Sequence, residues 1–275
     1  MVGRACLVLS IVVIALSLPV RAQQVYQPTV GQAGKDVVWV PTSLELIEKM
    51  LDLANVTRDD FVIDLGSGDG RNVIAAARRG ARGLGVEFNP DMVGLSKRLA
   101  AEAGVSQLAT FVEGDMYEAD ISQATVMALF LLPANMNRLE PKFLDLKPGS
   151  RIVANTFGFD GWEPDVREEL QSTDCSSWCN ALLWIVPAKV GGTWTMPEGT
   201  LSLQQSYQIV NGTLSMKGGK VELANARLRG EQIQFVAGGL SYVGRVTGDT
   251  MEGTVTAPDG TKPWIATRRN PSRQP

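Results

Sequence analysis

The sequence predicts an α/β fold, in which a parallel sheet with helices on both faces is followed by a small Gly-rich antiparallel β segment. Up to about residue 187, short apolar runs alternate with helical patterns, as in a parallel sheet covered by helices. Beyond residue 187, short alternating runs lie between Gly, Asn and Asp turns, which is typical of a meander or a small barrel. These two textures predict a domain over residues 37–187 and a second one over residues 188–269.

The composition excludes several classes of function. The 275 residues carry a net charge of −3, so no strong positive field attracts nucleic acid. No histidine is present, which excludes Ser-His-Asp and Cys-His catalysis and His-containing zinc and haem sites. With only three cysteines in addition, we expect no metal site. A general base would have to be a carboxylate, a Tyr, a Lys or the substrate itself.

Residues 1–22 have the layout of a secretory signal peptide. Arg4 precedes an apolar run of 16 residues over 5–20, and Ala22 ends the segment before a polar stretch. The alternative is a membrane anchor that is not cleaved, although the run is shorter than the roughly 20 residues that cross a bilayer. We therefore expect an exported protein of the periplasm or envelope, without a stable membrane span after cleavage.

Export also bears on the cysteines. Cleavage would remove Cys6 and leave Cys175 and Cys179 in an oxidising compartment, as a candidate disulfide. The alternative is two unrelated thiols, because sequence alone does not give the geometry of a bridge.

The elements follow in order along the chain. Residues 23–36 are polar and read as a flexible leader. Thr42 as N-cap and Glu45 three residues later form a capping box that opens a helix. Further strands are predicted at 61–65, 83–87, 109–112, 124–132 and 151–156, and further helices at 72–79, 89–104 and 134–144.

In the second half, the predicted hairpin turns are Asn211-Gly212 and Asp259-Gly260, and residues 270–275 read as a frayed tail.

A glycine-rich loop joins the strand at 61–65 to the following helix. It reads Asp64-Leu65-Gly66-Ser67-Gly68-Asp69-Gly70, and its glycines permit a tight turn and close approach of a ligand. The acid at Asp64 would repel a diphosphate but suits a ligand with an ammonium group. Glu87 ends the next strand, where a carboxylate can bind a ribose diol, and Asp115 follows the third strand beside Met116.

These residues resemble a known family. Residues 62–71, VIDLGSGDGR, closely resemble the S-adenosylmethionine (SAM) loop of class I methyltransferases, and Glu87 and Asp115 fall where that family has its ribose and adenine acids. The resemblance covers about residues 37–187. It implies a Rossmann-like class I methyltransferase sheet, SAM as cofactor and an enzyme that transfers a methyl group to a nucleophile.

A narrower resemblance concerns residues 39–42 (WVPT), the loop LGSGDGR and Leu131-Leu132-Pro133. These look like a small lysine-methyltransferase group that includes the mitochondrial enzymes acting on the c subunit of the ATP synthase and on the adenine nucleotide translocase. This resemblance implies a protein lysine as acceptor. The β segment after residue 187 is not part of the eukaryotic enzymes.

The resemblance assigns two sets of residues, while no catalytic residue is assigned. The cofactor set is Asp64, Gly66, Ser67, Gly68, Gly70, Glu87, Phe88, Asp115, Met116 and Phe130. The substrate or lid set is Trp39, Pro41, Thr42, Leu132 and Pro133, and for the aromatic and Pro positions core packing is an alternative role.

Two other functions stay open. The chain could be a non-catalytic envelope protein with a degenerate SAM pocket and a β interaction module, or a methyltransferase of small molecules. The expected partner is thus a protein or small-molecule methyl acceptor, and not a nucleic acid.

Overall fold

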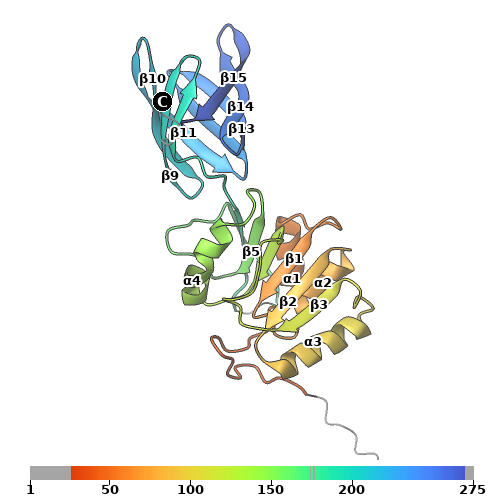
Figure 1. The fold of residues 1–275 in the computed structure, drawn as a ribbon. Coiled ribbons are helices and arrows are strands. Elements are labelled where there is room, and N and C mark those ends of the chain that lie inside the picture. The colour runs from red at the N-terminus through yellow and green to blue at the C-terminus, as the bar shows by residue number, and fades with distance from the viewer. Residues whose placement is uncertain (1–25, 174, 176, 270–275) are drawn as a thin grey trace, which may run out of the picture.

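The computed structural model describes residues 26–173, 175 and 177–269. The predicted signal peptide and the predicted tail lie outside these residues. The chain forms an α/β domain and, at one end of it, a β-barrel (Figure 1). In the described part of the chain, no helix is both long and apolar enough to cross a membrane.

The α/β domain contains four helices and seven strands within the described residues. Its helices are α1 (Leu44–Leu53), α2 (Arg71–Arg78), α3 (Pro90–Glu102) and α4 (Pro133–Leu144). Its strands are β1 (Phe61–Leu65), β2 (Arg82–Glu87), β3 (Ala109–Glu113), β4 (Val126–Leu129), β5 (Arg151–Asn155), β6 (Val166–Glu169) and β7 (Asn180–Ile185).

The strand order of this sheet is β3-β2-β1-β4-β5-β7-β6. Strands β1 to β5 are parallel, which confirms the predicted parallel sheet. Strand β7 runs antiparallel to β5, and β6 antiparallel to β7. The sequence did not predict these last two strands, so the sheet is mixed at this edge.

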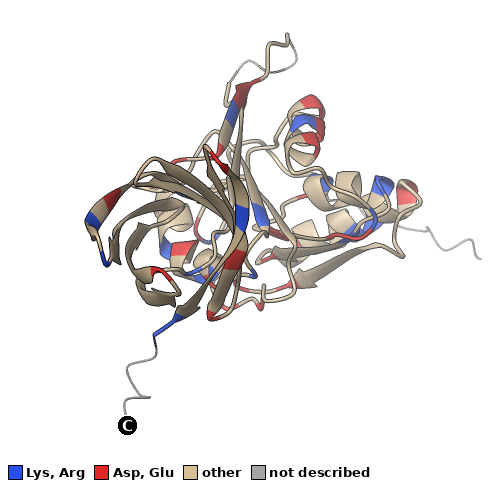
Figure 2. Cartoon of the chain, turned by 90° about the horizontal axis from the view of Figure 1, so that it is seen from above, with Lys and Arg blue, Asp and Glu red and all other residues tan. Residues whose placement is uncertain are grey.

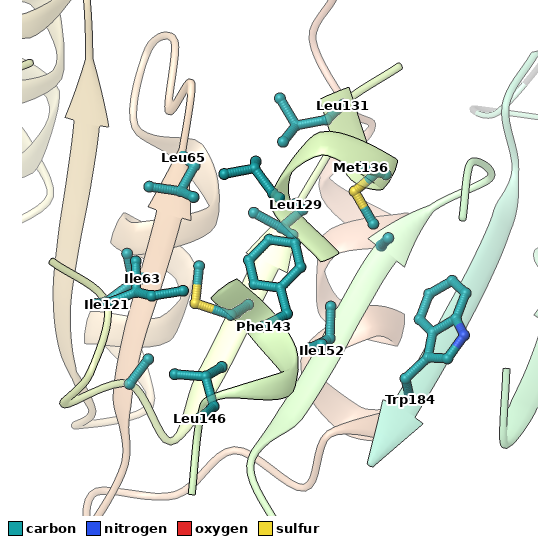
Figure 3. Close-up of a cluster of buried hydrophobic side chains, with 14 of the residues drawn as sticks. Ile63, Leu65, Ile121, Leu129, Leu131, Met136, Phe143, Leu146, Ile152 and Trp184 are labelled. Carbon is teal, nitrogen blue, oxygen red and sulfur yellow. The ribbon is translucent and has the colours of Figure 1, made fainter. Parts of the chain in front are cut away.

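Alternating side chains of the strands fill two cores, one on each face of the sheet. Ile63 and Leu65 of β1 pack with Phe143 of α4, and Figure 3 shows this cluster. Val62 of β1 packs on the other face, with residues of α1 and α2. The intervening Asp64 therefore faces α2, which begins directly after the glycine-rich loop.

The start of α1 differs from the prediction by one residue. The N-cap is Ser43, whose Oγ accepts a hydrogen bond from the N–H of Leu46. Thr42 is not the cap, because its hydroxyl instead accepts a hydrogen bond from Asn155 Nδ2 (3.3 Å). The helix α3 begins as predicted, with Asn89 as N-cap and Pro90 in the first turn.

The second domain is a closed eight-stranded antiparallel barrel in the order β10-β11-β12-β13-β14-β15-β8-β9. Phe235, Tyr242 and Trp264 stack and pack edge to face inside it. Its strands are β8 (Gly192–Met196), β9 (Gly199–Ser206), β10 (Ile209–Met216), β11 (Gly219–Arg229), β12 (Gln232–Ala237), β13 (Leu240–Thr247), β14 (Thr250–Ala257) and β15 (Gly260–Arg268).

The turn predicted at Asn211-Gly212 is wrong. Both residues lie inside β10 and pair with β9. A Cβ on Gly212 would lie 2.1 Å from the carbonyl oxygen of Ser202, so the glycine serves close approach of two strands rather than a turn. The other predicted turn is shifted by one residue, because Gly260 already begins β15 and pairs with Ala257.

The barrel contacts the α/β domain through the turn between β9 and β10. The ring of Tyr207 stacks on Trp162 with 5.4 Å between centroids. Gln208 Nε2 donates to the carbonyl of Glu163 (2.8 Å). On β11, Arg227 forms an ion pair with the buried side chain of Asp165 (2.8 Å). The barrel is therefore packed against the segment that connects β5 to β6.

Candidate cofactor and acceptor site

A pocket lies at the carboxyl ends of β1 and β2 and is covered by residues 32–42. Most of the predicted cofactor set lines it, namely Asp64, Gly66, Ser67, Gly68, Glu87, Phe88, Asp115, Met116 and Phe130. Trp39, Pro41 and Thr42 of the predicted lid line it as well. Gly70, Leu132 and Pro133 do not lie among the lining residues.

The glycine-rich loop owes its shape to three left-handed residues. Gly66, Gly68 and Gly70 have φ of +69°, +56° and +81°, a region that other residues rarely adopt. A Cβ on Gly68 would lie 2.8 Å from Nε1 of Trp39, so a side chain here would collide with the cover. A Cβ on Gly70 would meet the ring of Phe111 at 2.5 Å. Gly70 thus shapes the loop from behind the pocket, as the N-cap of α2.

Glu87 is held at the rim of the pocket by two backbone groups. Its Oε2 accepts from the N–H of Gly68, and its Oε1 accepts from the N–H of Asn89, both at 2.9 Å. Each carboxylate oxygen keeps a further acceptor site, so the side chain can also bind two hydroxyl groups. This geometry matches what a ribose diol requires.

Asp64 is buried beneath the glycine-rich loop. Burial raises its pKa well above the usual range, and the charges of Glu87 and Asp69 raise it further, against a hydrogen bond from Asn72 Nδ2 (3.0 Å). A buried carboxylate of this kind is stabilised by a positively charged ligand. The site therefore favours a cation at this point.

Two buried polar atoms of lining residues lack a hydrogen-bond partner among the described residues. They are Oγ of Ser67 and Oδ1 of Asn72. Unpaired polar atoms are costly when they are buried, so a bound polar ligand would satisfy them. Together with the cradle that a Cβ would fill at Gly68, they fit a ligand with ammonium, carboxylate and ribose groups, such as SAM.

The residues that cover the pocket include Lys35, which forms an ion pair with Asp115. Lys35 Nζ lies 2.6 Å from Oδ2 of Asp115 and 4.9 Å from the ring centroid of Phe88. The hydrogen bond from Lys35, followed by one from the N–H of Tyr117, holds the pKa of Asp115 below its usual range. No sequence signal pointed to this pair, because 80 positions separate its members.

Residues 26–36 have defined contacts in the structure, where the sequence predicts a flexible leader. The N–H of Gly31 donates to the carbonyl of Trp39, and the N–H of Trp39 donates to the carbonyl of Gln32. Gln32 also donates through Nε2 to the hydroxyl of Tyr26 (2.7 Å). The leader and the lid residues thus form one cover over the pocket.

Arg71 ties this cover to the glycine-rich loop. Its guanidinium binds the Asp69 carboxylate through Nε and Nη2, and Nη1 donates to the carbonyl of Thr42 (2.6 Å). Sequence reasoning missed this role, although Arg71 directly follows the loop and begins α2.

Three aromatic rings gather beside the pocket at the ends of β4 and β5. Phe130 stacks on Phe157 with 6.1 Å between centroids, and Trp178 lies 6.1 Å from Phe130. Asn155 ends β5 and is buried, and its Oδ1 has no partner among the described residues. Cys175 and Cys179, the candidate disulfide, are joined by a disulfide in the loop that carries Trp178.

Leu132 and Pro133, which belong to the predicted substrate or lid set, lie at the start of α4 and do not line the pocket. Leu132 is the N-cap of α4, and Pro133 is the first residue of that helix. Leu131, the preceding residue, instead reaches the loop, since a Cβ on Gly66 would lie 3.4 Å from its Cδ2.

Comparison with known proteins agrees with this geometry. The family described as ANTKMT methyltransferase domain matches residues 64–166. A protein-lysine N-methyltransferase of Saccharolobus islandicus is 40% identical over 131 residues, which are 46% of this chain and 81% of that protein. The mouse lysine N-methyltransferase named for the c subunit of the ATP synthase is 38% identical over 128 residues, and the match spans about half (51%) of its length.

A solved structure is similar as well. The crystal structure of an RNA methyltransferase from Salinibacter ruber in complex with S-adenosyl-L-homocysteine has 42% identity and a TM-score of 0.50, and the match covers 55% of this chain and 96% of that one. The glycine-rich loop, the acids Asp64 and Glu87 and these similarities all indicate the same cofactor, SAM. The chain therefore belongs to the class I SAM-dependent methyltransferases, in the family described as ANTKMT methyltransferase domain.

Proposed function

We propose that this protein transfers a methyl group from SAM to the side-chain amine of a protein lysine. The main support is the pocket itself, in which Asp64 and Glu87 lie on either side of the glycine-rich loop. A cluster of aromatic side chains adjoins this pocket. The lysine acceptor is supported by the names of the relatives from Saccharolobus islandicus and mouse.

The residues of this site act by binding and orientation. SAM supplies a methyl group on a positively charged sulfur. In the transfer, the amine lone pair forms the N–C bond as the C–S bond breaks, the electron pair stays on sulfur and the amine releases a proton. Alignment alone contributes effective molarities of about 10⁵ M or more, so no covalent nucleophile is needed. Asp64 would hold the ammonium group of the cofactor, and Glu87 would hold its ribose hydroxyls.

RNA is a second candidate acceptor, because the similar structure from Salinibacter ruber is that of an RNA methyltransferase. Nucleic-acid binding depends on clustered positive charge. This chain carries 26 Lys and Arg against 29 Asp and Glu, and Figure 2 shows both signs interspersed over the two domains. The charge distribution therefore favours a protein acceptor.

We also propose that the mature protein acts outside the cytoplasm, in the periplasm or envelope. The N-terminal pattern of Arg4 followed by the apolar run at 5–20 supports export. The disulfide between Cys175 and Cys179 is of a kind that persists in oxidising compartments.

Calorimetric titration of residues 23–275 with SAM and with S-adenosylhomocysteine tests the cofactor site. We expect micromolar affinity, and a loss of roughly 1 to 3 kcal/mol in Glu87→Ala, because charge-assisted hydrogen bonds are removed. Glu113→Ala is the matched control, since Glu113 ends the adjacent strand, pairs in register with Glu87 and is not a lining residue. Absence of binding by the folded protein would instead favour the non-catalytic envelope protein.

Labelled SAM with envelope protein extract and, separately, with total RNA tests the acceptor. We expect label in methyl-lysine after acid hydrolysis of the protein fraction. Label in RNA alone would overturn the lysine assignment. Label only in small molecules would instead favour a methyltransferase of small molecules.

A further inference from the structure

We propose that Phe130, Phe157 and Trp178 form a subsite for an alkylammonium group, and that the Cys175–Cys179 disulfide holds Trp178 in that subsite. The ligand class is the cationic end of an amine acceptor and of its methylated product. This proposal rests on the proposed transfer to an amine, and it adds how this chain recognises that amine.

The three rings lead from the cofactor pocket toward solvent. Phe130 directly follows β4 and lines the pocket. Phe157 lies almost parallel to it, at 13° between ring planes, just after β5. Trp178 is tilted by 55° against Phe130 and is 45% exposed. A side chain that passes along these rings would reach the methyl-donating pocket.

Trp178 is held in an unfavourable backbone conformation. Its φ is +56°, which costs a bulky residue energy and persists only where the surroundings enforce it. The disulfide spans Trp178, and the next residues are anchored too. The carbonyl of Cys179 accepts from the N–H of Leu170 (2.7 Å), and that of Asn180 from the N–H of Thr156 (2.7 Å). The strain thus serves to place an exposed indole beside Phe130.

An exposed indole at this place suits a cation. Trp attracts ammonium groups most strongly of the aromatic side chains, and methylation leaves the positive charge in place. The subsite would therefore accept every methylation state of a lysine. A carboxylate at this place would stabilise the protonated amine more strongly than aromatic rings do, and so would hinder attack more.

Asn155 supplies an independent observation at the same edge of the sheet. It is 2% exposed, and its Nδ2 donates to Thr42 Oγ1, a residue of the pocket lining. Its Oδ1 has no partner among the described residues. This oxygen could therefore accept a hydrogen bond from the amine that receives the methyl group. A neutral amide oxygen can orient an N–H without fixing a proton on the amine.

Binding of choline to the full chain saturated with S-adenosylhomocysteine tests the subsite, with 3,3-dimethylbutan-1-ol as its uncharged isostere. We expect choline to bind more tightly than the alcohol. Trp178→Ala should weaken choline binding about two- to thirtyfold and leave the affinity for S-adenosylhomocysteine unchanged, and Trp178→Phe should restore part of the loss. Ile265→Ala, at an exposed apolar position on the barrel, is the matched control and should change neither.

The disulfide has its own comparison. Reductant should weaken choline binding by the wild-type chain but not by Cys175→Ser/Cys179→Ser, which should already bind weakly. Equal affinities for choline and the alcohol, or wild-type affinity in Trp178→Ala, would overturn the subsite. Unchanged binding after reduction would overturn the role of the bridge.

These outcomes separate the subsite from the proposed function. Choline binding that depends on Trp178, without methylation of any lysine, would contradict the function and leave the subsite intact. Lysine methylation with the same KM for acceptor in wild type and Trp178→Ala would contradict the subsite and leave the function intact.

Discussion

Asp64 shows at the scale of one residue how binding and stability oppose each other. Its carboxyl group is buried, with one side-chain hydrogen bond from Asn72 and with the negative charges of Glu87 and Asp69 nearby. Without a cation, the ionised form is unfavourable there, so the pKa of Asp64 in the folded protein lies well above its usual range. The cofactor's positive groups would lower this pKa again, which links the charge of Asp64 to ligand binding.

Asp64→Asn should therefore stabilise the free protein and weaken cofactor binding. Because the folded-state pKa is raised above the unfolded value, wild-type stability falls as pH rises from the usual carboxyl range toward the raised pKa. The Asn variant lacks this loss, so its free energy of unfolding should exceed that of wild type at neutral pH, while SAM affinity drops about tenfold or more. Urea denaturation across pH and calorimetry measure both quantities.

Asp59→Asn is the control for this prediction, because Asp59 is exposed and lies at the other end of β1. A variant at position 64 that is less stable than wild type at neutral pH would show that the buried charge is already compensated.

At the scale of elements, the cover illustrates a contact that the sequence could not predict. The glycine-rich loop was predictable because its acid and glycines lie within seven consecutive residues between a strand and a helix. The Lys35–Asp115 pair was not, since it depends on how residues 26–36 fold back over the sheet. The turn predicted at Gly212 was wrong for a related reason. Glycine occurs both in turns and where two strands approach closely, and only the neighbouring strand distinguishes the two cases.

Arg71→Ala should loosen the cover and so shorten the residence of SAM. The guanidinium joins Asp69 of the loop to the Thr42 carbonyl of the cover, and an alanine removes both contacts. We expect dissociation to accelerate several-fold with little change in association, because the charged rim of the pocket stays in place. Arg71→Lys should be intermediate, since it keeps the charge without the planar fork.

Stopped-flow fluorescence of Trp39 and the other tryptophans measures these rates. Arg78→Ala is the control from the same helix, as Arg78 is exposed in its last turn. Equal dissociation rates in Arg71→Ala and wild type would show that the cover is held by its other contacts.

At the scale of the whole molecule, the barrel contacts the core of the α/β domain through an aromatic stack on Trp162. Trp162 is buried and packs on Phe159 and Trp184, which belong to the core of the α/β domain. Its ring is covered from the barrel side by Tyr207, whose own φ is +53° and whose hydroxyl donates to Glu140 (3.0 Å). The segment between β5 and β6, which begins next to Phe157, is thereby fixed by a domain that lies outside the residues matching the family.

Tyr207→Ala should consequently destabilise the α/β domain, although the substitution lies in the barrel. Loss of the stack exposes Trp162 and removes an aromatic pair, which together cost about 1 to 3 kcal/mol. Tyr207→Phe keeps the stack and loses only the hydrogen bond to Glu140, so about 1 kcal/mol or less is expected. Hydrogen exchange of the amides in β5 and β7 reports the effect directly, and Val243→Ala on an exposed face of the barrel should leave it unchanged. If Tyr207→Ala accelerates exchange only in β9 and β10, the barrel is merely attached to the α/β domain and does not support the segment beside the acceptor site.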